Sequence, residues 1–167
     1  MRIGASMTLC TALALCPAAV LAEGDATYAT RNLTLDTALK AAQAALAKCR
    51  DSGWQAAVAV VDRGGVLQVL LRDRYAGPHT PATARGKAWT AVSFRSNTSA
   101  LVEPTQPGKA QSGMRSLPHV VILGGGMVIE GGGQMLGAIG VSGAPGGESD
   151  DACAKAGIAA IRDSIEF

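Results

Sequence analysis

The chain has 167 residues, with 15 basic and 13 acidic side chains and a formal net charge of +2 at pH 7. This near balance excludes the strong positive field with which nucleic-acid-binding and anionic-membrane-binding proteins attract their targets. Aromatic residues make up only 4% of the chain, so Ala, Val, Leu and Ile must fill the core and let its elements pack closely.

The first 22 residues show the order of features of a secretory signal peptide. Arg2 gives a positive start, residues 3–21 are almost free of polar side chains, and small residues precede Glu23. Pro17 interrupts an apolar run that barely reaches the roughly 20 residues needed by a membrane-spanning helix. We therefore predict cleavage after Ala22, a periplasmic or secreted protein, and no membrane attachment after cleavage.

The rest of the chain is predicted to fold as one domain. Residues 23–32 are short and polar and indicate a loose N-terminal arm, and residues 33–167 carry the domain itself. A chain of this length can bury a core of its own. No internal repeat and no second domain is visible.

Four cysteines occur, of which Cys10 and Cys16 lie in the signal segment. The remaining pair, Cys49 and Cys153, favours a disulfide because an exported chain meets an oxidising compartment. Such a bond would close a loop of about 100 residues and contribute up to roughly 4 to 5 kcal/mol. Two separate buried thiols are the alternative. No CxxC motif or nearby histidine completes a metal site for this pair.

The first half of the domain shows helix, hairpin and helix patterns in turn. Apolar residues recur at helical spacing over residues 35–49, with Thr34 as N-cap and Gly53 just past the end. Two apolar runs, 54–61 and 66–71, flank a DRGG turn and predict a β-hairpin. After a loop, Thr80-Pro81 starts a helix to about residue 94, with an inner face of alanines.

The second half begins with a short helix at residues 96–102 and an exposed loop at 103–113. Three further strands are predicted at residues 120–123, 127–129 and 135–142, and Asp150 or Asp151 opens a last helix. Five strands joined mainly by short turns predict a mainly antiparallel sheet packed by helices. The fold class is therefore α+β, with layering like that of profilin and PAS domains.

Glycine clusters separate the last strand-like runs, at residues 124–126 and 131–133. A phosphate-binding loop would need to open a helix, whereas each cluster here leads into another strand-like run. Most of these glycines are interpreted as sheet turns. The cluster Gly124, Gly125 and Gly126, before Met127, exceeds what one turn needs, and a flat ligand could lie against its backbone.

His79 and His119 are the only imidazoles in the chain. Either can bind haem iron or another metal through a ring nitrogen. An ordinary surface position is the alternative for each of them. Met114 and Met127 are softer candidate ligands.

Cations cluster around the loop that carries His79 and the helix that follows. They can pair with carboxylates, either haem propionates or a small organic acid. A solvated helix face, with Asp62 and Asp73 nearby, is the alternative. The cluster comprises Arg72, Arg74, Arg85 and Lys87.

Three stretches together resemble the GlcG/HbpS-like family, also described as haem-degrading or PduO C-terminal-like domains. They are VAVVDRGGVLQVLLRDRYA at residues 58–76, TPATARGKAWTA at residues 80–91, and the run from LGGGMVIEGGG at residue 123 to DDACAKAG at residue 157. This resemblance covers nearly all of the chain beyond residue 22.

The resemblance implies a compact α+β domain, assembly into symmetric homo-oligomers, and binding of haem or a related tetrapyrrole. On this basis we expect an exported haem-binding protein for haem sequestration or haem-linked stress protection. His79 or His119 would contact the iron, Arg85 or Lys87 would lie near the propionates, and residues 124–127 would line the site. The alternative is an enzyme or accessory protein for a small hydroxy- or keto-acid, with Asp62 or Asp73 handling a proton. No enzyme activity is assigned.

Overall fold

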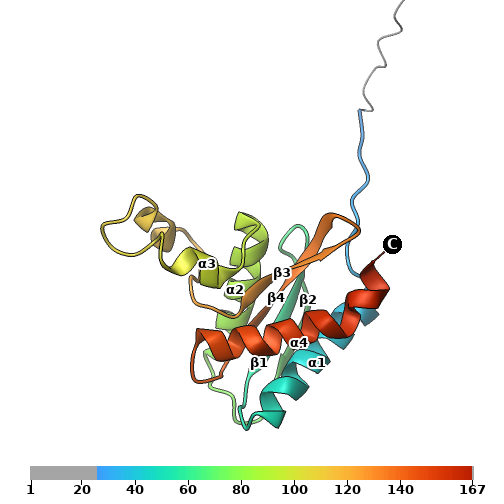
Figure 1. Cartoon of the computed structure of the whole chain (residues 1–167), viewed down its shortest axis with the longest axis horizontal. Helices are drawn as coiled ribbons and strands as arrows, with labels where there is room; N and C mark the ends of the chain where they lie inside the picture. The colour runs from blue at the N-terminus through green and yellow to red at the C-terminus, as the bar shows by residue number, and fades with distance from the viewer. Residues whose placement is uncertain (1–25, 167) are drawn as a thin grey trace, which may run out of the picture.

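The structure is a computed structural model that describes residues 26–166. The predicted signal peptide, including Cys10 and Cys16, lies outside the described residues, as does the first part of the predicted arm. Residues 26–34 contain no helix or strand and lead directly into the first helix (Figure 1).

A single antiparallel sheet forms the middle of the domain, with its strands in the order β2-β1-β4-β3. β1 and β2 are the predicted hairpin, and β4 pairs with both β1 and β3. The predicted α+β class and antiparallel sheet are confirmed. The strands are β1 (Ala57–Asp62), β2 (Leu67–Arg72), β3 (Gly126–Gly131) and β4 (Gln134–Ser142).

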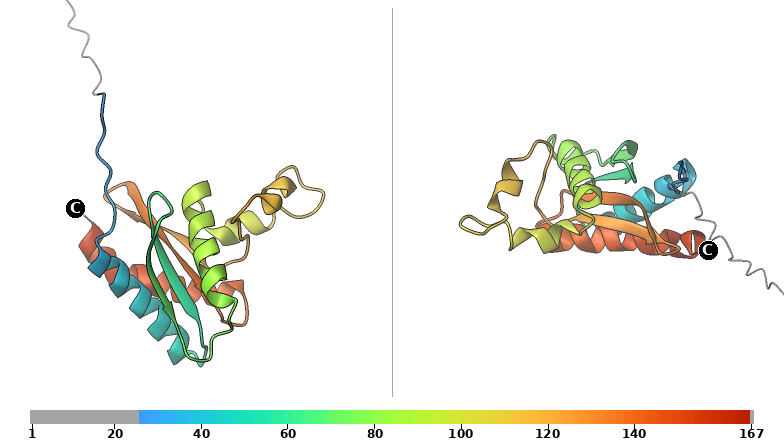
Figure 2. Two further views of the ribbon diagram at one scale, coloured as in Figure 1. Left: turned by 180° about the vertical axis from the view of Figure 1, so that it is seen from behind. Right: turned by 90° about the horizontal axis from the view of Figure 1, so that it is seen from above.

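Helices cover both faces of this sheet (Figures 1 and 2). α1 (Leu35–Asp51) and α4 (Gly147–Ile165) lie side by side on one face, and α2 (Thr80–Phe94) lies on the other. The short α3 (Thr98–Val102) and the 3-10 helix η1 (Ser112–Ser116) extend beyond the sheet from the end of α2.

Alternation along β1 explains why the two faces differ. Val58 and Val60 enter the larger core beneath α1 and α4, whereas Ala57 and Ala59 face α2. At Gly140, opposite Ala59, a Cβ atom would lie only 2.0 Å from the carbonyl oxygen of Ala84. α2 therefore packs very closely on its face of the sheet, as the alanine-rich composition predicts.

The hairpin turn is held by one aspartate. Asp62 accepts hydrogen bonds through Oδ1 from the amides of Gly64, at 2.8 Å, and Val66, at 2.9 Å. This is an Asx turn, in which a side-chain oxygen accepts hydrogen bonds from backbone amides further along the turn.

The prediction of five strands is wrong, because residues 120–123 do not form a strand. The amide of Val121 donates to the side chain of Thr90 on α2, at 2.8 Å, instead of to a neighbouring strand. His119, just before it, has a φ of 66°, which breaks an extended backbone. The segment thus runs along α2 and reaches the sheet only at Gly126.

The last helix also begins earlier than predicted, at Gly147 instead of Asp150 or Asp151. Its N-cap is Gly146, which has no side chain to cap the helix. Asp150 and Asp151 therefore lie within the first turns of the helix, where the positive end of the helix dipole stabilises carboxylates.

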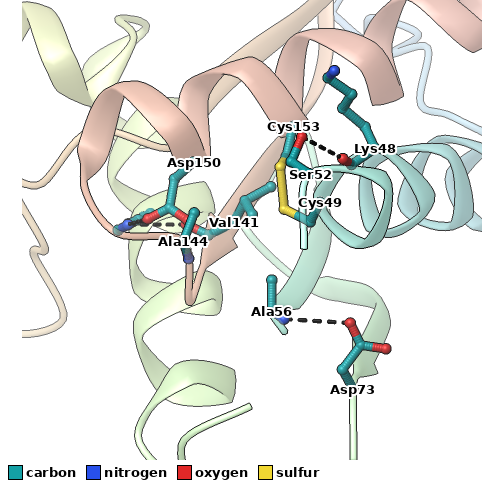
Figure 3. Close-up of a disulfide and its surroundings, with 10 residues drawn as sticks. Lys48, Cys49, Ser52, Ala56, Asp73, Val141, Ala144, Asp150 and Cys153 are labelled. Atoms are coloured by element: carbon teal, nitrogen blue, oxygen red, sulfur yellow. Dashed lines mark hydrogen bonds and ion pairs between the residues drawn. A yellow bond between two sulfur atoms is a disulfide. The ribbon is translucent and has the colours of Figure 1, made fainter. Parts of the chain in front are cut away.

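Cys49 and Cys153 form a disulfide that joins α1 to α4, with their Cα atoms 5.5 Å apart (Figure 3). Both residues are buried in the larger core. Of the two alternatives left open by the sequence, the disulfide is the one found. Among residues 26–166, no helix combines the length and apolar character needed to cross a membrane.

Candidate functional site

A cavity opens where several loops meet at one end of the sheet. We call it the wide hollow; its volume is about 980 Å3. This lies at the upper end of the roughly 300 to 1,000 Å3 typical of ligand sites. Its walls come from residues 53–55, the loop and first turns of α2, α3, residues 123–124, and the segment 142–151 that leads into α4.

His79 lies on the rim of the wide hollow, at the N-cap of α2. Its side chain makes no capping hydrogen bond, and the residue is exposed. The ring lies over Gly77, where a Cβ atom would come within 2.7 Å of Cε1. The missing side chain at Gly77 therefore leaves room for the imidazole beside the hollow.

Three large apolar side chains line the same hollow as this imidazole. Tyr75 is 77% exposed and Leu123 is 54% exposed, and both line the hollow together with Trp54. Exposed apolar side chains gathered at one opening are typical of a surface that a ligand or partner covers.

Lys87 lines the same hollow but is not available to a ligand. Its ammonium group donates to Asp150, at 2.7 Å, and to the carbonyl of Val141, at 2.9 Å. The side chains of Lys87 and Asp150 are only 3% and 5% exposed. The ammonium group therefore serves the protein's own architecture.

Burial acts against the charge of Asp150. Desolvation raises the pKa of this carboxyl above its ordinary value, more strongly than its hydrogen bond to Lys87 and the amide of Ala144 lower it. Figure 3 shows Asp150 reaching from α4 toward Val141 and Ala144. The pair joins α2 to α4 and ties both helices to the end of β4 and to the loop after it, which lines the hollow.

The triple glycine is explained by the protein's own packing. The Gly125 amide donates to Asp151, at 2.6 Å, and the Gly126 amide to Thr98, at 2.9 Å. A Cβ atom at Gly126 would lie 2.4 Å from the carbonyl oxygen of Lys87. Of the predicted wall residues, only Gly124 lines the hollow, while Met127 packs in the larger core.

The other predicted site residues lie in a second cavity, which we call the narrow hollow. It has a volume of about 410 Å3 and is lined by Gly65, Ala82, Arg85, Gly86, Trp89, His119 and Val121. The structure thus brings His79 together with Lys87, and Arg85 together with His119, in two separate places. Along α2 the reason is geometric, since residues 85 and 87 point about 200° apart around a helix.

The carboxylates considered for proton transfer are also engaged. Asp62 holds the hairpin turn, as described above. Asp73 is buried, accepts hydrogen bonds from Arg50 and receives the Ala56 amide at 3.3 Å. Arg72 donates to the carbonyl of Ala76, at 2.7 Å. Asp73 and Arg72 thus hold the segments on either side of the wide hollow's Trp54 and Tyr75, whereas Asp62 holds the turn that borders the second cavity.

Sequence reasoning missed the partner of Lys87 and the role of Asp151. A signal was present for Lys87, because it falls beside Ala84, Ala88 and Ala91 on the inner face of α2. Nothing in the spacing revealed which carboxylate would reach it from 63 residues away. Over residues 26–166, no group of three or more His, Cys, Asp or Glu side chains is arranged to hold a metal ion.

Comparison with known proteins fits this architecture. The family model described as "Haem degrading protein HbpS-like" matches residues 33–159, and the chain belongs to that family. An uncharacterised 15.0 kDa protein from the dhaT-dhaS intergenic region of Citrobacter freundii is 34% identical over 113 residues, covering 66% of this chain and 80% of that protein.

Two solved structures are similar in fold. A double mutant of HbpS from Streptomyces reticuli is 39% identical, with a TM-score of 0.75, over 86% of this chain and 97% of that one. A structure described as a PduOC:heme complex is 32% identical, with a TM-score of 0.74, over 78% of this chain and 95% of that one. The expected family is therefore confirmed.

Proposed function

We propose that the chain is a haem-binding protein in which His79 holds the iron at the wide hollow. Membership of the HbpS-like family and the similarity to a PduOC:heme complex support haem as the ligand class. The observation that carries the proposal is the exposed imidazole of His79, which has no capping bond and borders the larger cavity.

The residues present fit a haem group. Haem has a wide apolar body, and the hollow offers exposed Tyr75 and Leu123 with Trp54 beside them. Its iron accepts an imidazole nitrogen, which His79 supplies. Among residues 26–166, Lys87 is the only Lys or Arg that lines the hollow, and it is already paired with Asp150. The propionates would therefore extend from the opening into solvent.

Titration of haemin into the purified protein, followed by the Soret band, tests this assignment. We expect a saturable Soret shift that His79→Ala abolishes or weakens at least about tenfold, which corresponds to about 1.4 kcal/mol. His119→Ala is the matched control, because it removes the other exposed imidazole, which lies in the narrow hollow, and it should leave the titration unchanged.

Three outcomes would contradict the assignment. Absence of any shift in the wild type would remove haem as the ligand. Loss of binding only in His119→Ala would move the iron to the narrow hollow. An unchanged titration in both variants, with loss in Tyr75→Phe, would assign the iron to the phenolate of Tyr75, which also lines the wide hollow.

We further propose that the protein is exported, assembles as a homo-oligomer and serves haem sequestration or protection from haem-linked stress. The buried disulfide supports an oxidising compartment. In the described sheet, the outer edges of β2 and β3 have no neighbouring strand, and a second copy could cover them. Cell fractionation and light scattering on the purified protein test location and assembly; a cytoplasmic monomer would refute both.

A further inference from the structure

We propose that the narrow hollow is a second ligand site, which binds a small organic carboxylate with a flat apolar body. The site lies on the face of α2 that points away from Lys87, between the hairpin turn at Gly65 and the segment before β3. It is independent of the proposed haem site.

Hydrogen bonds and close packing fix the walls of the narrow hollow. The segment carrying His119 and Val121 is fixed to α2, because the Val121 amide donates to Thr90 and the Thr90 hydroxyl donates to the carbonyl of Gly86, at 2.7 Å. A Cβ atom at Gly86 would come within 2.5 Å of the Val121 side chain. The glycine therefore permits the close contact that closes one side of the hollow.

The polar groups of the narrow hollow are suited to binding an anion. Arg85 and His119 are both exposed, and neither side chain has a hydrogen-bond or ion-pair partner within residues 26–166. None of the acidic residues in the part of the chain that the structure describes lines this hollow. A guanidinium group binds a carboxylate through two parallel hydrogen bonds, and an imidazole nitrogen can donate a further one.

Its apolar groups suit a flat body. The rings of Trp89 and His119 meet edge to face, with centroids 6.0 Å apart and planes at 65°. Trp89 also lies against Gly65, where a Cβ atom would come within 2.9 Å of the indole. Two rings at such an angle form a corner against which a third ring can pack.

The backbone conformation of His119 also supports a binding site at the narrow hollow. Among the described residues, only Arg95 and His119 have a positive φ without being glycine. Arg95 ends α2 as its C-cap, where this conformation is common. His119 follows no helix of this kind, with a φ of 66°. A strained residue held beside an open cavity is a frequent mark of a binding site.

Size separates this ligand from a tetrapyrrole. A cavity of about 410 Å3 lies near the lower limit of ligand sites, whereas the wide hollow is more than twice as large. A molecule with one aromatic ring and one carboxylate fits within the narrow hollow and complements its charge. We therefore use benzoate as the probe.

The two tryptophans of the chain allow a selective test, because Trp54 lines the wide hollow and Trp89 the narrow one. In a Trp54→Phe background, benzoate should cause a saturable change in Trp89 fluorescence. Arg85→Gln should weaken this binding at least about tenfold, as expected for loss of a charge-assisted pair. Benzamide, which has the same ring without the charge, should bind at least about tenfold more weakly.

His79→Ala is the matched control and should leave benzoate binding unchanged. The proposal fails if benzoate causes no saturable change, if Arg85→Gln binds it as well as the parent, or if benzamide binds equally. Loss of binding in His79→Ala alone would place benzoate in the wide hollow. A negative haemin titration with normal benzoate binding would refute only the proposed haem function.

Discussion

The two hollows use charge in opposite ways. In the wide hollow the ammonium of Lys87 is buried and bonded to Asp150 and to a backbone carbonyl. In the narrow hollow the guanidinium of Arg85, two residues earlier on the same helix, is exposed and has no partner within residues 26–166.

This difference shows that lining a cavity does not make a charged group available to a ligand. A buried ion pair is part of the architecture, because its removal leaves a charge that neither water nor a partner stabilises. An exposed cation contributes little to stability and is free to bind an anion. Substitutions of Lys87 and Arg85, on the two sides of α2, test that division.

The largest effect is expected for Lys87→Met. This substitution leaves Asp150 buried without its ammonium partner and should lower the free energy of unfolding by about 3 to 5 kcal/mol. Urea denaturation at neutral pH measures the loss. The double variant Lys87→Met/Asp150→Asn should recover part of it, since no lone charge remains and the amide oxygen can still accept from Ala144.

The pH dependence of the same variant sharpens the comparison. Burial already raises the pKa of Asp150 in the folded wild type, and loss of Lys87 removes a group that lowers it. When the pKa of a carboxyl is higher in the folded than in the unfolded state, the free energy of unfolding is largest at low pH. It falls as the pH rises from the unfolded-state pKa through the folded-state pKa. The penalty of Lys87→Met should thus shrink on acidification; an equal penalty at neutral and acidic pH would contradict the role given to Asp150.

The next largest effect is expected for the disulfide between α1 and α4. The double variant Cys49→Ser/Cys153→Ser should lose about 2 to 4 kcal/mol, because the bond closes a loop with a sequence separation of 104. Reduction of the wild type with dithiothreitol in urea should bring its midpoint close to that of the variant. Equal unfolding of the oxidised and reduced wild type would show that the bond contributes nothing.

Much of the fold could be predicted from the sequence because its signals are local. Helical spacing, the Thr34 cap and the Thr80-Pro81 start fixed α1 and α2 to within two residues. The hairpin followed from its turn residues. Residues 120–123 were wrongly predicted as a strand because a run of Val, Ile and Leu is typical of one. The hydrogen bond from Val121 to Thr90 that replaces strand pairing depends on a contact between residues 31 positions apart.

The site was harder to predict for the same reason. The triple glycine gave a correct signal of close approach, but the approaching atoms belong to Lys87, Thr98 and Asp151 and not to a ligand. The two histidines were candidates because they are the only imidazoles in the chain, and the cations because they lie near His79 or on the helix that follows it. The opposite directions of Arg85 and Lys87 around α2, and the position of His119 in the segment beside Arg85, separate these residues into two cavities.

The smallest effect on stability is expected for Arg85→Gln. An exposed side chain without polar partners should change the free energy of unfolding by no more than about 0.5 kcal/mol. Urea denaturation beside Lys87→Met compares two cations on one helix under identical conditions. A loss above about 1 kcal/mol would show that Arg85 is held by the fold after all, and the guanidinium could then no longer be regarded as a free anion-binding group. A neutral result combined with lost benzoate binding would mean that this cation serves recognition while its neighbour serves the fold.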